Sequence, residues 1–176
     1  MNWTKLLKTE MESTYCATAR LLDRVDASNL EWKPASGTNW MTMGQLIRHI
    51  ADACGAGCRG FVIGEWGLPE GKTWADLTAE ENLPPAEILP ASASVEEAKR
   101  LLDEDRALAL AMVDYAGELR LAVEVAPTPW APEVKRLLGM QLLQMVRHLD
   151  RHKSQLFYYL KLEGVPVDTR DLWGGP

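Results

Sequence analysis

Helical periodicity dominates the first third of the chain. Between Trp3 and about Val25, apolar residues recur at steps of three and four with charged residues between them, which predicts an amphipathic helix. Residues 26–41 are rich in turn-forming residues, so a loop should follow. At Thr42 the sequence T-M-G-Q matches a capping box, and an apolar stripe continues from it. We expect a second helix from Thr42 to about Gly64, although its glycines weaken it by about 1 kcal/mol each.

Two further helices are predicted in the second half of the chain. A capping box at Ser94 precedes a stripe of apolar residues that reaches Tyr115, which indicates a third helix. Residues 120–130 alternate in polarity before two prolines, so this segment is expected to form a short strand or an extended crossing. Helical periodicity then runs from Val134 to Glu163, with Pro132 well placed in the first turn. This fourth helix should be the longest, at roughly 45 Å.

Four helices without strong strands between them predict an all-α fold, a four-helix bundle whose cofactor sites lie between facing helices. The 176 residues are 47% apolar, which suits a single domain spanning residues 1–176. Residues 65–93 form a long connection between helices two and three that holds four prolines. Such a length can cross the bundle, so neighbouring helices need not be antiparallel.

Net charge and hydropathy limit the classes of binding partner that we expect. Acidic residues outnumber basic ones by 25 to 19, the net charge is -6, and no dense basic stripe occurs, so no nucleic-acid partner is expected. No segment approaches the roughly 18 uncharged apolar residues of a membrane span, and the first residues lack the apolar centre of a secretory signal. We therefore expect no membrane contact and a cytoplasmic location.

The chain has three histidines, and their positions predict a metal chelate. His148 and His152 are four residues apart in the fourth helix, so both imidazoles can turn toward one ion about 2.1 Å from each nitrogen. His49 lies on the apolar stripe of the second helix. Polar rings on core faces need partners, and one metal ion would satisfy all three while leaving a coordination position open to water or a substrate. Three imidazoles suit Zn, Ni, Cu and Fe alike.

The alternative is that each histidine is an ordinary buried residue bonded to a carbonyl or a carboxylate, which is the commoner situation for a lone histidine. The placement of every histidine on an apolar face, including a pair at i and i+4, favours the shared metal. The metalloprotease pattern H-E-x-x-H does not apply, because Leu149 stands where its catalytic glutamate should be. No residue is assigned a catalytic role.

The sequence says less about the charged residues close to the histidines. Asp52, three residues after His49, is equally compatible with orienting a metal ligand or accepting a proton and with an exposed surface position. Asp150 and Arg151 should be surface charges that point away from the imidazoles.

The cysteines and one tryptophan are expected to be structural. Cys16, Cys54 and Cys58 form no even disulfide framework, so free thiols are predicted. Cys58 falls roughly opposite His49 around the helix axis, so it and Cys54 should be small buried residues and not metal ligands. Trp40 should pack in the core, with a place at a pocket mouth as the alternative.

Four motifs together resemble the DinB/YfiT family of metal-binding four-helix bundles over nearly the whole chain. They are L-I-R-H-I-A-D-A around His49, R-H-L-D-R-H-K-S-Q-L-F-Y-Y-L around His148 and His152, W-K-P at 32–34 and R-D-L-W-G at 170–174. The resemblance implies an up-down-down-up bundle and frequent dimers. It also implies a Zn or Ni site made by His49, His148 and His152.

Two classes of function follow. Members of the resembled family include transferases and isomerases that use low-molecular-weight thiols, and metal coordination lowers the pKa of a thiol and produces the nucleophilic thiolate. We therefore expect a metal-dependent enzyme that transfers a small thiol to an electrophilic small-molecule substrate, as a homodimer. The alternatives are a non-catalytic metal-binding or stress-response protein and a metal-dependent hydrolase.

Overall fold

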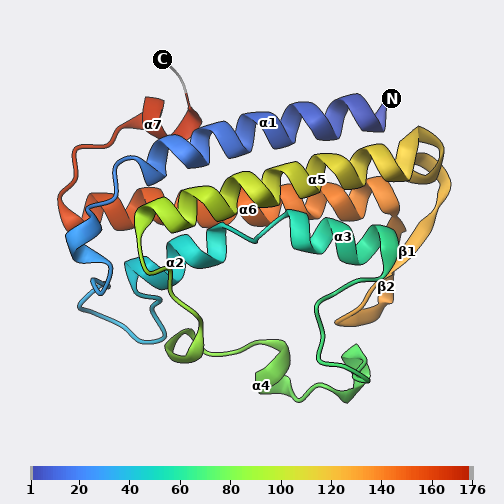
Figure 1. Cartoon of the computed structure of the whole chain (residues 1–176), viewed down its shortest axis with the longest axis horizontal. Helices are drawn as coiled ribbons and strands as arrows, with labels where there is room; N and C mark the ends of the chain where they lie inside the picture. The colour runs from blue at the N-terminus through green and yellow to red at the C-terminus, as the bar shows by residue number, and fades with distance from the viewer. Residues whose placement is uncertain (1, 175–176) are drawn as a thin grey trace.

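The computed structural model describes residues 2–174 and is mostly helical (Figure 1). The long helical elements are α1 (Trp3–Leu22), α2 (Met43–Ile50), α3 (Gly55–Ile63), α5 (Val95–Val123) and α6 (Leu138–Glu163). The shorter elements are the helices α4 (Ala79–Asn82) and α7 (Thr169–Trp173), the 3-10 turns Ala27–Asn29, Trp74–Asp76 and Ala86–Ile88, and the strands β1 (Val125–Thr128) and β2 (Ala131–Leu137). The predicted all-α class is confirmed, with one small hairpin added.

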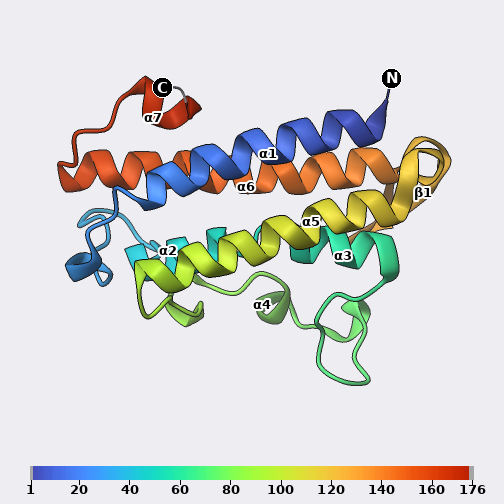
Figure 2. The ribbon, with the colours of Figure 1, turned by 45° about the horizontal axis from the view of Figure 1, so that its top comes forward.

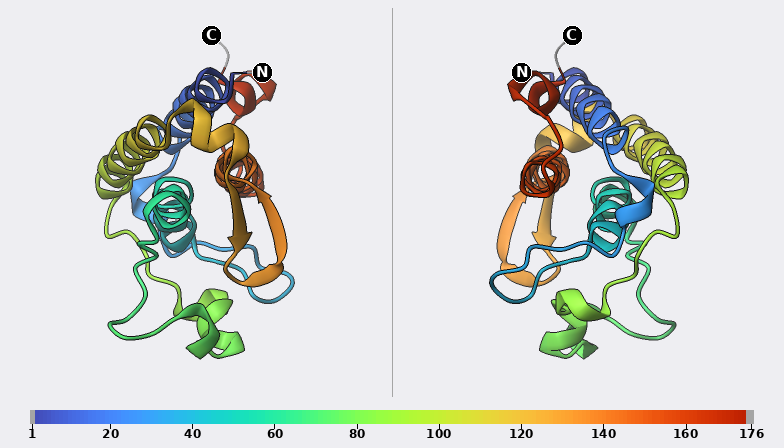
Figure 3. Two further views of the ribbon diagram at one scale, coloured as in Figure 1. Left: turned by 90° about the vertical axis from the view of Figure 1, so that its right-hand side faces the viewer. Right: turned by 90° about the vertical axis from the view of Figure 1, so that its left-hand side faces the viewer.

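The long helices lie alongside one another. In Figure 1, α1 and α6 run in one direction along the long axis, whereas α2, α3 and α5 run in the opposite direction. Helices α2 and α3 follow each other in one column, so the end-on views of Figure 3 show helical columns grouped around a common interior. Figure 2 shows α1, α5 and α6 side by side, and each of these helices contacts the other two.

Amphipathic patterning explains this packing. On α1, Leu7, Met11 and Leu21 are fully buried, and on α6 the same holds for Leu149 and Leu156. The buried side chains of the long helices join one hydrophobic core. The helix predicted from Trp3 is confirmed and ends at Leu22, three residues earlier than expected.

The second predicted helix is not continuous. It ends at Ile50, and α3 starts at Gly55 after a turn, so the expectation of one helix from Thr42 to about Gly64 was wrong. The carboxylate of Asp105 on α5 accepts hydrogen bonds from the backbone N–H groups of Cys54 (3.2 Å) and Ala56 (3.1 Å), which caps the new helix. A Cβ on Gly55 would lie 2.3 Å from the backbone oxygen of Asp105, so glycine is what lets α5 approach this turn.

The segment between α5 and α6 forms an antiparallel hairpin. Val125 pairs with Leu137 and Ala126 with Arg136, so of the two alternatives left open for residues 120–130 the structure shows the short strand, although helix α5 first continues to Val123. Pro132 lies in β2 and not in the first turn of α6, which corrects the predicted start of the fourth helix. In this two-stranded sheet both strands are edges, and an edge strand tolerates proline.

The connection between α3 and α5 is long, as predicted, and projects from the bundle, with α4 in its lower part in Figure 1. The side-chain amide of Gln45 on α2 donates to the carbonyl oxygens of Ala86 (2.8 Å) and Leu89 (2.9 Å), which fastens the end of this connection. Within residues 2–174, none of the helices combines the length and the apolar character needed to traverse a bilayer.

Candidate metal centre

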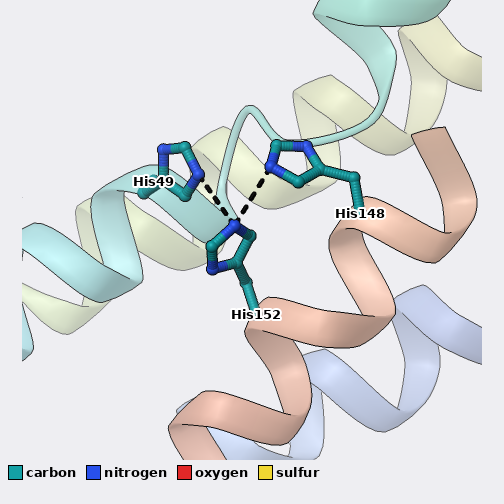
Figure 4. A group of neighbouring side chains, drawn as sticks. All are labelled: His49, His148 and His152. Atoms are coloured by element: carbon teal, nitrogen blue, oxygen red, sulfur yellow. Dashed lines mark hydrogen bonds between the residues drawn. The ribbon is translucent and has the colours of Figure 1, made fainter. Parts of the chain in front are cut away.

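The three histidines meet between α2 and α6 (Figure 4). The Nε2 atom of His152 lies 3.1 Å from Nε2 of His49 and 3.0 Å from Nε2 of His148. The i,i+4 spacing on α6 places His148 and His152 one turn apart on the same face, and α2 presents His49 opposite them. The structure therefore brings together the three residues that the sequence selected.

In two of the rings, the outer nitrogen Nδ1, which faces away from the other histidines, is held by a hydrogen-bond acceptor. His148 Nδ1 lies 2.8 Å from the carbonyl oxygen of Ala53, and His152 Nδ1 lies 3.0 Å from Oε1 of Gln155. Because a carbonyl oxygen only accepts, each Nδ1 must carry the proton, and the neutral ring then has its lone pair on Nε2. Two lone pairs therefore face each other across 3.0 Å, an arrangement that a cation between them would stabilise.

The distances suit a transition metal. An ion about 2.1 Å from each imidazole nitrogen in tetrahedral geometry holds two ligands about 3.4 Å apart. The observed Nε2 separations of 3.0 and 3.1 Å are close to that value, and the ligand atoms of all three histidines lie within 4.8 Å of one another. Small side-chain rotations are enough to complete the triangle, and neutral imidazoles suit borderline metals such as Zn and Ni.

The site keeps His49 and His152 neutral. Burial, together with the nearby His148 and Arg48, lowers the pKa of His49 to about 4. Burial and the nearby His49 also lower the pKa of His152 to about 4, against a weaker opposing effect of the Gln155 hydrogen bond. Both rings are thus deprotonated and available as ligands at neutral pH.

These shifts predict that the metal-free protein loses stability as the pH falls from 7 to 5. In this range the unfolded chain protonates its histidines, with pKa values near 6.5, while the folded rings of His49 and His152 stay neutral, so the unfolded state binds more protons. After allowance for solvent screening, the free energy of unfolding should drop by about 2 kcal/mol. Urea denaturation of the metal-free protein at several pH values measures this. A free energy of unfolding that does not change across this range would contradict the neutral, desolvated state of the two rings.

The turn between α2 and α3 supplies one of the two hydrogen-bond acceptors that hold the imidazole rings. Ala53 lies in this turn, and its carbonyl oxygen accepts a hydrogen bond from His148. The turn is held by Asp105, which is buried and also accepts from the hydroxyl of Tyr15 at 2.6 Å. Desolvation raises the pKa of Asp105, and its hydrogen bonds oppose that effect. This hydrogen-bond network thus links α1, α5 and the turn, and the turn in its place orients the imidazole of His148.

The histidines border two cavities that share a wall. A cavity of about 580 Å³ is lined by all three histidines, and a second of about 430 Å³ is lined by His148. Trp74 from the long connection and Trp130 from the hairpin line both cavities. Their ring centroids are 5.5 Å apart, and Trp66 packs on both rings. Two segments remote in sequence thus form an aromatic wall beside the candidate metal position.

The structure places the three charged residues near the histidines in different surroundings. Asp52 lines the smaller cavity, and its carboxylate forms an ion pair with the guanidinium of Arg48 at 2.7 Å. The hydrogen-bond acceptors that hold the imidazoles are other residues, Ala53 and Gln155. Asp150 is exposed and pairs with Lys153, as expected of a surface charge. Arg151 is exposed too, but it lines the smaller cavity, so the expectation that it points away from the site was incomplete.

The predicted structural residues are confirmed in part. All three cysteines are free in the described structure, Cys54 and Cys58 are fully buried, and Cys16 is exposed. Trp40 is 37% exposed and packs its ring 6.0 Å from that of Tyr159, so it covers the core edge and is not part of the core itself.

Sequence reasoning missed the residues that support the histidines. Gln155 stands three residues after His152, and this spacing on a helix could have identified it. The roles of Ala53 and Asp105 depend on a turn that the helical pattern concealed. The tryptophan wall likewise joins segments that no local pattern connects.

Comparison with known protein families identifies a relationship. The sequence profile of the DinB superfamily matches residues 10–156, a range that contains all three histidines. Neither the curated proteins nor the solved structures include a match to this chain.

Proposed function

The chain belongs to the DinB superfamily, and on this basis we propose that His49, His148 and His152 hold one divalent transition-metal ion, Zn or Ni. We further propose that the protein is a metal-dependent enzyme that activates a small thiol for transfer to an electrophile. The convergence of the Nε2 atoms supports the metal site, and the adjoining cavities support the enzyme.

One observation carries the metal proposal. The carbonyl of Ala53 and the amide oxygen of Gln155 hold the outer nitrogens of His148 and His152 as donors, so the inner nitrogens present lone pairs to one point. Buried histidines without a metal would be expected to pair donor with acceptor across such a short distance. The arrangement matches the second-shell bonds that orient metal-bound imidazoles.

The surroundings of the histidines support catalysis over a purely structural site. A closed structural site would be surrounded by protein, whereas all three histidines line a cavity of about 580 Å³. A bound divalent ion would lower the pKa of a thiol or of water placed on it. The histidines would hold the ion, Trp74 and Trp130 would exclude bulk water on one side, and the cavity would position the electrophile.

The proposal predicts turnover that depends on both metal and thiol. Gently purified protein should contain close to one equivalent of metal by elemental analysis. The metal-loaded protein should then consume electrophiles in the presence of small thiols, and the rate should fall to background when either the metal or the thiol is omitted. Equal turnover without thiol would indicate a hydrolase instead, and inactivity across a broad panel would favour a non-catalytic metal-binding protein.

Two expectations about the architecture stay predictions. The helix directions in Figure 1 support the up-down-down-up order implied by the resemblance. A homodimer would have an exposed apolar surface to use, since Tyr115, Leu119 and Val123 on α5 are each more than half exposed.

A further inference from the structure

The smaller cavity beside His148 carries two positive charges without protein partners. Arg136 on β2 and Arg151 on α6 both line this cavity of about 430 Å³. Neither guanidinium makes a hydrogen bond or an ion pair in the described part of the chain, whereas Arg106 and Arg120 bond Glu12 and Glu124. In a chain of net charge -6, two unpaired arginines at one cavity are a local exception.

The carboxylate on the same cavity does not cancel this charge. Asp52 is the acidic residue in the lining, and its Oδ2 lies 2.7 Å from the guanidinium of Arg48. This ion pair neutralises Asp52 within α2 and the following turn, so Arg136 and Arg151 leave the cavity positively charged. A guanidinium presents a planar set of N–H donors that matches a carboxylate better than any neutral ligand.

Another part of the lining is apolar. Trp66, Trp74 and Trp130 pack edge to face with ring centroids 5.5–6.1 Å apart. At these separations the rings fill the space between one another, so they form a wall and leave no room for a cation among them. Such a wall binds an apolar or aromatic body by contact.

We infer that this cavity binds a small carboxylate with an apolar or aromatic body, which lies against the tryptophan wall while its carboxylate pairs with the guanidinium of Arg136 or of Arg151. The inference rests on the proposed function in one respect, since it identifies the bound molecule as a substrate whose other end reaches His148. The recognition itself needs only the cavity and its two arginines.

The test compares two probes that differ in charge alone. Binding of 4-phenylbutanoate and of its neutral amide, 4-phenylbutanamide, is measured by calorimetry on the zinc-loaded protein. We expect the carboxylate to bind at least about tenfold more tightly, because hydrogen bonds to charged groups contribute more than neutral ones. The double variant Arg136→Gln/Arg151→Gln should reduce this preference to less than about threefold. Arg147→Gln is the matched control, because Arg147 lies on α6 but lines a different cavity next to α1, and it should keep the preference.

Repeating the titrations on metal-free protein separates this inference from the metal proposal. A preference that persists without metal and disappears in the double variant supports the arginine site, even if no metal binds to the histidines. A preference that requires zinc and survives in the double variant would show that the carboxylate binds the ion, and would overturn the inference. Equal binding of the two probes, or no binding of either, would also overturn it.

Discussion

Replacing His152 with alanine should abolish stoichiometric metal binding. His152 Nε2 is the atom that lies about 3 Å from both other histidines, so its loss leaves His49 and His148 without the central ligand. Changes to second-shell residues alone cost about 10- to 100-fold in metal affinity, so the loss of a ligand should cost more than about 100-fold. Competition with a chromophoric chelator at pH 7.5 measures the affinity.

Graded variants make this result specific. Gln155→Leu removes the acceptor that fixes the His152 ring and should weaken binding by about 10- to 100-fold. Ser154→Ala changes a neighbouring residue whose hydroxyl bonds the Asp150 carbonyl, and should leave affinity unchanged. His49→Ala repeats the ligand test from α2 in case His152→Ala does not fold. Full occupancy in both histidine variants would show that the metal, if present, binds elsewhere.

Replacing Asp105 with alanine should lower the free energy of unfolding by about 3–5 kcal/mol. The change leaves the buried hydroxyl of Tyr15, the buried N–H group of Cys54 and the half-buried N–H group of Ala56 without an acceptor. An unsatisfied buried donor costs about 1–3 kcal/mol, and water entering the space reduces the total. Urea denaturation at pH 7 gives the value. Metal affinity should fall as well, because the turn that presents the Ala53 carbonyl to His148 loses its support.

Two further variants test this explanation. Asp103→Ala removes an exposed carboxylate from the same helix and should change stability by less than about 0.5 kcal/mol. Tyr15→Phe removes one of the hydrogen bonds to Asp105 and should cost about 1 kcal/mol. If Asp105→Ala proves as mild as Asp103→Ala, the buried carboxylate does not hold the turn.

The periodicity of apolar residues in the sequence was sufficient to predict the all-α class and the candidate metal ligands. Apolar residues at steps of three and four identify the buried faces of α1 and α6, because one face of a helix repeats every 3.6 residues. The same geometry places His148 and His152 on one face before any coordinates are known. His49 could be added because its apolar stripe pointed it into the interior, where a polar ring needs a partner.

The tertiary structure alone decided how the site is built around these histidines. The break between α2 and α3 depends on Asp105 of α5, which is about fifty residues away in sequence and replaces the helical hydrogen bonds of the turn. Pro132 lies in a strand and not in a helix because residues 131–137 pair with β1, whose Ala126 carbonyl also accepts a hydrogen bond from the side chain of Gln141. Trp74 and Trp130 meet only when the long connection and the hairpin fold toward each other. Local pattern determines which face of an element is buried, whereas long-range contacts determine where elements stop and which residues line a cavity.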